Sequence, residues 1–125
     1  MGSLKVGLTI SSNSILSSAV NITTTTSAVA DSGVVVRAKI LKTAIDANAL
    51  VVYKENDKLV SAYLYVKNLE KEKENYLWIY NATESDALVS KISGGEFCFI
   101  PVDVTKTYKI FSTKVDSLVD YAVFG

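Results

Sequence analysis

The chain has 125 residues, of which 49% are hydrophobic and 21% charged, and its 13 basic residues balance its 13 acidic ones. This length suits one domain that buries its own core, and the composition excludes wholesale disorder. The charge balance argues against nucleic acid or an anionic membrane as a partner, because both bind positively charged surfaces; no apolar run approaches the ~20 residues that cross a bilayer.

The N-terminal residues alternate between apolar and polar side chains. Leu4, Val6, Leu8 and Ile10 are apolar, and the residues between them are small or polar, which is typical of a half-buried strand. The Ser/Thr-rich stretch that follows keeps the two-residue period over residues 19–29, and threonine is a good strand former. We therefore predict two strands here, the second of them exposed with a polar outer face.

A turn, a strand and a short helical segment are predicted next. Asp31-Ser32-Gly33 is typical of a turn, and the strand over residues 34–41 follows it. The apolar residues that share one face of this strand are Val34, Val36, Ala38 and Ile40. Residues 43–50 predict a helical turn capped by Thr43. This turn is too short to be stable alone, so we expect it to bridge two strands.

Residues 59–84 predict a β-hairpin. Two strands rich in aromatic and β-branched residues flank the charge run Glu70-Lys71-Glu72-Lys73-Glu74, which reads as a solvated loop. After residue 86, short apolar segments separated by turn residues recur about every ten residues, the spacing of an all-β sandwich or barrel.

The faces of this hairpin depend on its loop length. A turn symmetric about Glu72 places Ala62, Leu64, Val66, Trp78 and Tyr80 on one face, and Tyr63, Tyr65, Lys67, Ile79 and Asn81 on the other. A change of one residue in the loop instead gathers Tyr63, Tyr65, Trp78 and Tyr80. In both registers Tyr63 and Tyr65 lie on the less aliphatic face. Tyrosines there suit a protein interface or a sugar platform, or they merely cover the sheet. The candidate interface residues are Tyr63, Tyr65, Lys67, Trp78 and Tyr80.

The segment SGGEFCFIPVD, residues 93–103, contains the single cysteine and the single proline of the chain. Phe97 and Phe99 alternate with Cys98 and Ile100, which predicts a strand that is apolar on both faces, buried inside a sandwich or at a subunit contact. Cys98 between phenylalanines is expected to be buried and inert. Gly94-Gly95 predicts a tight turn, and Pro101 the end or edge of a strand.

Few residues suggest catalytic chemistry. The chain has no histidine, which removes the commonest general base and metal ligand. Glu84 with Asp86, or Glu96 with Asp103, are conceivable carboxylate pairs for glycoside hydrolysis, but acidic residues near turns usually cap them. Glu55-Asn56-Asp57 is too sparse for a calcium loop. We expect no enzymatic activity, no cofactor and no metal.

Three strand motifs carry a family resemblance. They are YLYVKN at Tyr63 to Asn68, GEFCFIP at Gly95 to Pro101, and YAVF at Tyr121 to Phe124, and they follow a Ser/Thr-rich N-terminal β segment. This pattern resembles small virion structural proteins of tailed bacteriophages. The resemblance implies a structural role in the particle, as capsid decoration or as a neck or tail component, and it brings no catalytic residue.

Together these observations predict an all-β fold over residues 1–125, a single-domain β-sandwich, jelly-roll-like, with about eight strands. The expected function is that of a non-enzymatic phage virion structural protein. Its expected partners are other virion proteins of the capsid or tail and copies of itself, with no nucleic acid and no membrane, and its expected location is the virion. The alternative is a carbohydrate-binding module of a tail appendage that uses Tyr63, Tyr65 and Trp78.

Overall fold

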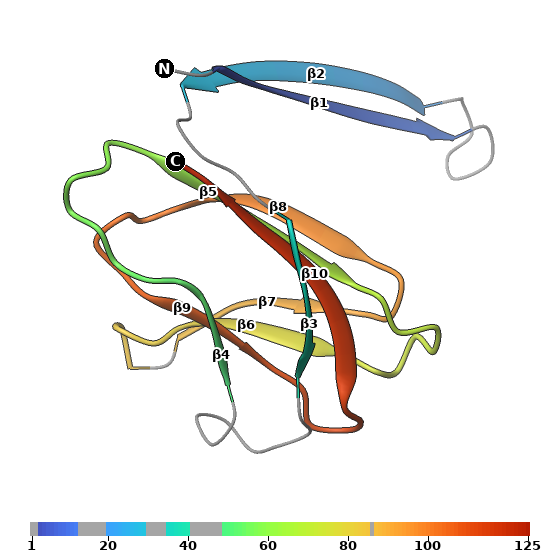
Figure 1. Ribbon diagram of the computed structural model, residues 1–125. Coiled ribbons are helices and arrows are strands. Elements are labelled where there is room, and N and C mark those ends of the chain that lie inside the picture. The colour runs from blue at the N-terminus through green and yellow to red at the C-terminus, as the bar shows by residue number, and fades with distance from the viewer. Residues whose placement is uncertain (1–2, 13–19, 30–34, 41–48, 86) are drawn as a thin grey trace. The chain divides into compact units, whose positions relative to one another are not determined.

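The computed structural model describes residues 3–12, 20–29, 35–40, 49–85 and 87–125, and the elements among them are all strands (Figure 1). They are β1 (Ser3–Ser12), β2 (Val20–Val29), β3 (Val36–Ile40), β4 (Leu50–Tyr53), β5 (Ala62–Asn68), β6 (Leu77–Asn81), β7 (Ala87–Ile92), β8 (Phe97–Val102), β9 (Tyr108–Phe111) and β10 (Ser117–Phe124). The described residues include no helix long and apolar enough to cross a membrane. The chain divides into two compact units, Met1–Asp31 and Ser32–Gly125.

The N-terminal unit is a β-hairpin. β1 and β2 pair antiparallel over ten residue pairs, from Ser3 opposite Val29 to Ser12 opposite Val20. Lys5, Gly7 and Thr9, at alternate positions of β1, are exposed. Both predicted N-terminal strands are therefore confirmed.

The second unit is a jelly roll of eight antiparallel strands. One sheet has the order β3-β10-β5-β8 and the other the order β4-β9-β6-β7. Most consecutive strands lie in different sheets (Figure 1). This is the two-sheet arrangement of jelly rolls. The predicted all-β, jelly-roll-like fold is confirmed.

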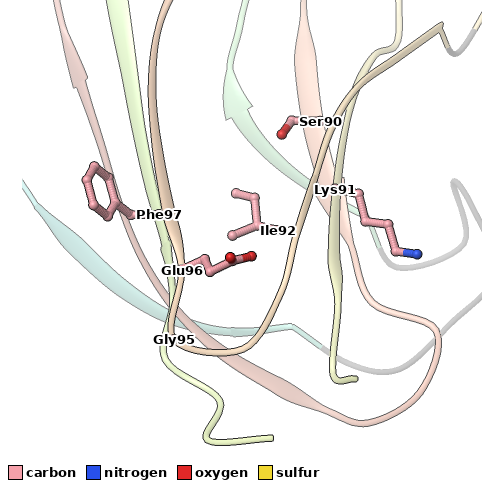
Figure 2. Close-up of a pocket in the computed structure, with 6 residues that line it drawn as sticks. All are labelled: Ser90, Lys91, Ile92, Gly95, Glu96 and Phe97. Atoms are coloured by element: carbon pink, nitrogen blue, oxygen red, sulfur yellow. The ribbon is translucent and has the colours of Figure 1, made fainter. Parts of the chain in front are cut away.

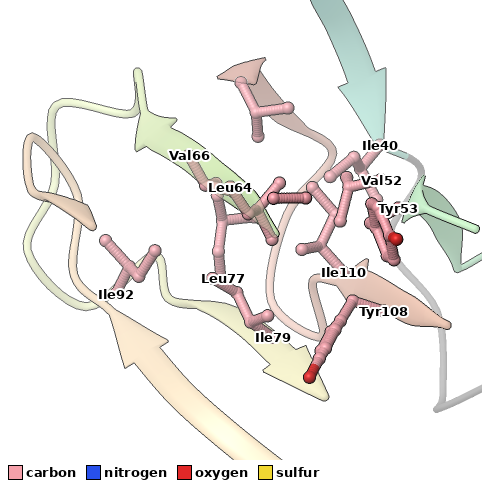
Figure 3. Packing of buried hydrophobic residues seen from close by; sticks show 12 residues of the cluster. Ile40, Val52, Tyr53, Leu64, Val66, Leu77, Ile79, Ile92, Tyr108 and Ile110 are labelled. Atoms are coloured by element: carbon pink, nitrogen blue, oxygen red, sulfur yellow. The ribbon is translucent and has the colours of Figure 1, made fainter. Parts of the chain in front are cut away.

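The core lies between the two sheets and is built from alternate residues of the strands. In β5, Ala62, Leu64 and Val66 are buried, whereas Tyr63 and Tyr65 between them are half-buried. The buried cluster consists of Ile40, Val52, Tyr53, Ala62, Leu64, Val66, Leu77, Ile79, Ile92, Tyr108, Ile110 and Val119 (Figure 3). Burying an aliphatic side chain of this kind contributes roughly 1.5–3 kcal/mol to stability.

The predicted hairpin over residues 59–84 is wrong. β5 pairs with β10 and β8, whereas β6 pairs with β9 and β7. The charged segment 69–76 is therefore a crossover between sheets. The physical reason is that β5 and β6 each have one aliphatic face. In Figure 3, Leu64 of β5 and Leu77 of β6 approach each other in the core, so these aliphatic faces pack against each other from opposite sheets and not side by side in one sheet.

Two other predictions concern the start of the jelly roll. The strand predicted over residues 34–41 is confirmed as β3, and its residues Ala38 and Ile40 contribute to the core side. The predicted turn at residues 31–33 and the body of the predicted helical turn, residues 43–48, lie outside the described residues.

Candidate interaction surface

The outer face of the β3-β10-β5-β8 sheet carries a group of aromatic side chains. Register places Tyr63 of β5 between Pro101 of β8 and Phe124 of β10, and Tyr65 lies opposite Phe99 in the next row. These residues alternate with core residues along each strand, so their side chains are on the side that faces away from the core. We call the group Tyr63, Tyr65, Phe97, Phe99 and Phe124 the aromatic surface.

The rings of the aromatic surface contact one another across the strands. The rings of Tyr63 and Phe99 stack with centroids 5.5 Å apart and an interplanar angle of 16°. Tyr65 and Phe97 lie at 6.3 Å, and Phe99 and Phe124 at 6.4 Å. These distances are typical of favourable aromatic pairs. Phe97 nevertheless remains 59% exposed, so the cluster is only partly covered within the chain.

Charged side chains continue the same face toward the edge strand β3. Asp120 lies in one row between Arg37 and Lys67, and it accepts two hydrogen bonds from Arg37, from Nε at 2.9 Å and from Nη2 at 3.2 Å. These bonds lower the pKa of Asp120, so its carboxylate is ionised at neutral pH. Lys39 and Lys67 lie beside this pair, and the border of the aromatic surface is therefore cationic.

The structure brings together only part of the predicted interface. Tyr63, Tyr65 and Lys67 share the outer face just described. Trp78 and Tyr80 belong to the other sheet, where both contact Phe111, Trp78 by stacking at 6.2 Å and Tyr80 edge-on at 5.5 Å. Trp78 does not lie on one face with Tyr63 and Tyr65, so the predicted grouping of these residues is wrong.

The Trp78 ring is also partly covered within its own sheet. It lies in one row between Phe111 and Lys91, and the Nζ atom of Lys91 is 4.8 Å from the Trp78 ring and 3.8 Å from the Tyr76 ring. Tyr80 is fully buried. Trp78 and Tyr80 thus pack against residues of their own sheet.

Sequence reasoning did not assign Phe97, Phe99 and Phe124 to the surface. The alternation in EFCFIPV does place Phe97 and Phe99 on one side and Cys98 and Ile100 on the other, and the structure confirms that division. It does not bury both sides, because the Phe97 side is open. β8 is one of the two edge strands of its sheet, and Pro101 lies in it as predicted.

Cys98 faces the core. It lies opposite Val66 and packs against the buried cluster while remaining half-buried. Burial raises the pKa of the Cys98 thiol to about 11. Because the reactive form is the thiolate, a raised pKa makes the thiol a poor nucleophile at neutral pH. Cys98 therefore lies on the core side, but it is only half-buried, whereas the sequence predicted a buried cysteine.

The candidate carboxylates are engaged in turns. Glu96 accepts a hydrogen bond from the Ser93 N–H at 2.9 Å, and Asp103 accepts bonds from the N–H and hydroxyl of Thr105. These bonds lower the pKa of both carboxyls, whereas a general acid needs a raised one. Glu84 pairs with Lys106 at 2.6 Å, and Asp86 lies outside the described residues.

A hollow of about 430 Å³ lies at the margin of the aromatic surface, where the chain turns from β7 into β8, and Figure 2 shows the residues that line it. It is lined by Ser90, Lys91, Ile92, Gly95, Glu96 and Phe97. Its two charged groups already have partners within the protein, Glu96 with Ser93 and Lys91 with Tyr76. No group of metal-ligating side chains occurs among the residues that the structure describes.

Comparison with known proteins adds information on the fold. No protein-family model and no curated protein matches the chain. A solved structure described as "Bacillus endospore appendages form a novel family of disulfide-linked pili" superposes with a TM-score of 0.54. The likeness is one of fold. The sequences are 13% identical, and the match covers 74% of this chain and 81% of the other.

Proposed function

We propose that this protein is a non-enzymatic structural subunit that associates with other proteins through its aromatic surface. The observation that carries the proposal is Phe97, 59% exposed beside four further rings on one sheet face. Clustered aromatic side chains are enriched in protein interfaces, and contiguous exposed apolar area marks interaction sites. A partner that covers the rings would remove this apolar area from water.

We further propose that the assembly is the virion of a tailed bacteriophage, as capsid decoration or as a neck or tail component. The support is that the three motifs of the resemblance fall on β5, β8 and β10, which are adjacent in one sheet. The five rings of the aromatic surface come from the same three strands. The features that resemble virion proteins and the features that form the surface therefore coincide.

The similarity in fold to a pilus protein supports a role in an assembly. We expect the subunits of this assembly to be joined by a different kind of contact. A single cysteine forms at most one disulfide bond, so it joins at most two chains. A disulfide-linked row of subunits needs each subunit to be bonded to two neighbours. Cys98 also faces the core, with its pKa raised to about 11. We therefore propose association by non-covalent contacts. A fold alone does not set function, so the aromatic surface remains the main support.

Phe97→Asp should reduce association without unfolding the protein. A carboxylate in a desolvated aromatic contact is costly, while a change at an exposed position usually alters stability little. Sedimentation velocity over a range of concentrations should show smaller species for Phe97→Asp than for the wild type, with a dissociation constant raised at least about 10-fold, equal to ~1.4 kcal/mol. The melting temperature should stay within a few degrees.

Leu88→Asp is the matched control, because Leu88 is 56% exposed on the other sheet. It should sediment like the wild type. Equal association of wild type and Phe97→Asp would contradict the proposal. A glycan array tests the carbohydrate-binding alternative. That alternative predicts that the monomeric protein binds glycans.

A further inference from the structure

The β1–β2 hairpin forms a two-stranded sheet of its own in the part of the chain that the structure describes. Among the described residues, β1 and β2 pair only with each other, and each strand is ten residues long. An isolated two-stranded hairpin is marginally stable in water, and a third strand or a packed face is normally needed. A further strand paired to this two-stranded sheet would meet that need.

The sequence of β2 lacks the features that protect a strand edge. Proteins blunt free edges with charged residues or proline. β2, VNITTTTSAV, has neither over ten residues, whereas the edge strand β8 contains Pro101 and the edge strand β7 contains Lys91. β1 contains Lys5 and also Gly7, which weakens a strand. β2 is thus the edge better suited to pair.

The absence of charge in β2 favours a second copy as the partner. In antiparallel self-pairing about a two-fold axis, residues near the axis meet their own copies, so a charged residue there would meet its like. β2 has none, and its centre is Thr23 to Thr26. An axis at Thr24 places Ile22 opposite Thr26 of the partner copy, and an axis at Thr25 places Thr24 opposite Thr26. In both registers, the residues on one face of the first hairpin lie opposite residues on the equivalent face of the second hairpin.

We propose that β2 pairs antiparallel with β2 of a second copy, about an axis at Thr24 or Thr25, to form a four-stranded sheet of order β1-β2-β2-β1. The pairing supplies the additional strands that a hairpin needs, and it joins threonines, which form favourable cross-strand pairs. This contact goes beyond the proposed function, because it does not use the aromatic surface. It gives each copy a second contact region, so the two together link more than two chains.

Cysteine cross-linking of the full chain tests the pairing. Single cysteines replace Thr23, Thr24, Thr25 or Thr26 in a Cys98→Ala background, or a Cys98→Val background if alanine lowers the melting temperature. Directly opposed residues in antiparallel strands have Cα atoms roughly 4.5–5.5 Å apart, which a disulfide can span. Under mild oxidation, Thr24→Cys or Thr25→Cys should form covalent dimers at least about 10-fold faster than Thr9→Cys, an exposed position of β1.

The yield of cross-linked dimer should rise with protein concentration. It should fall sharply when the cysteine is moved to either side of the favoured position. Adding Phe97→Asp should leave the cross-link intact, which separates this contact from the aromatic surface. Cross-linking at all four positions no faster than at Thr9→Cys would overturn the proposal. A uniform yield along β2 would overturn it as well, because it would indicate collision rather than a register.

Discussion

Replacing Asn68 by aspartate should destabilise the jelly roll by about 3–5 kcal/mol, the cost of a buried charge without a partner. Asn68 is fully buried at the end of β5. Its Nδ2 donates to the carbonyl oxygens of Asn75 at 2.7 Å and Ile92 at 3.1 Å, and its Oδ1 accepts the N–H of Glu70 at 3.1 Å. An aspartate keeps the acceptor but places a carboxylate oxygen against two carbonyl oxygens.

The backbone of Asn68 belongs to the same junction. Its N–H donates to Glu96 at 2.9 Å and its carbonyl accepts from Gly95 at 3.0 Å. The residue therefore fixes the crossover 69–76 and the turn that precedes β8. Thermal unfolding should show a melting temperature lower by roughly 15 °C or more for Asn68→Asp. The loss should be smaller near pH 4 than at pH 7, because a protonated carboxyl costs less to bury.

Asn56→Asp is the control for Asn68→Asp. Asn56 is exposed, and its Oδ1 accepts the N–H of Lys58 at 3.1 Å. A carboxylate accepts this bond equally well, so the change should alter stability by less than about 0.5 kcal/mol. Similar losses for the two variants would show that Asn68 does not have the anchoring role described.

Gly94→Ala should cost about 3 kcal/mol or more, the upper range for an added methyl group in a packed site. A Cβ at Gly94 would overlap the backbone carbonyl of Glu72, and the carbonyl oxygen of Glu70 lies 2.9 Å away from it. Both neighbours are backbone atoms, which cannot rotate away as a side chain can. Chemical denaturation should show a lower midpoint with an unchanged slope.

Gly95→Ala separates close packing from backbone strain. Gly95 has φ = 82°, and nothing lies within 4 Å of a Cβ placed there. Alanine should therefore cost only the strain of the left-handed conformation, about 1–2 kcal/mol. If Gly95→Ala destabilised the protein more than Gly94→Ala, close packing of the turn against the crossover would not be the reason that residue 94 must be glycine.

Local alternation in the sequence was enough to predict most strands of the jelly roll. β5, β8 and β10 follow a two-residue period, and Gly94-Gly95 marks the turn that the structure contains. The pairing of β5 with β10 joins Phe124 to Tyr63, about 60 residues apart. No local pattern encodes such a pairing, since it depends on which aliphatic faces fit together across the core.

The same limit explains the errors at the candidate site. Tyr63, Tyr65 and Lys67 were predicted correctly as neighbours because they lie on one strand. Trp78 and Tyr80 were grouped with them only through the assumed hairpin, and they belong to the other sheet. The sequence also contains a signal at Asn68. This residue continues the buried series Ala62, Leu64 and Val66, and a polar residue at a core position implies a set of buried hydrogen bonds.

Hydroxyl-radical footprinting of the wild-type protein, dilute and then concentrated into its assembled form, measures directly whether the aromatic surface is the contact. Phe97 and Tyr65 should lose most of their reactivity toward hydroxyl radicals on assembly. Leu88, on the other sheet, should keep its reactivity. Tyr80, which is fully buried, should stay unreactive in both states and report that the fold is intact. An assembled sample in which Phe97 stays as reactive as in the dilute protein, while Leu88 becomes protected, would contradict the proposal.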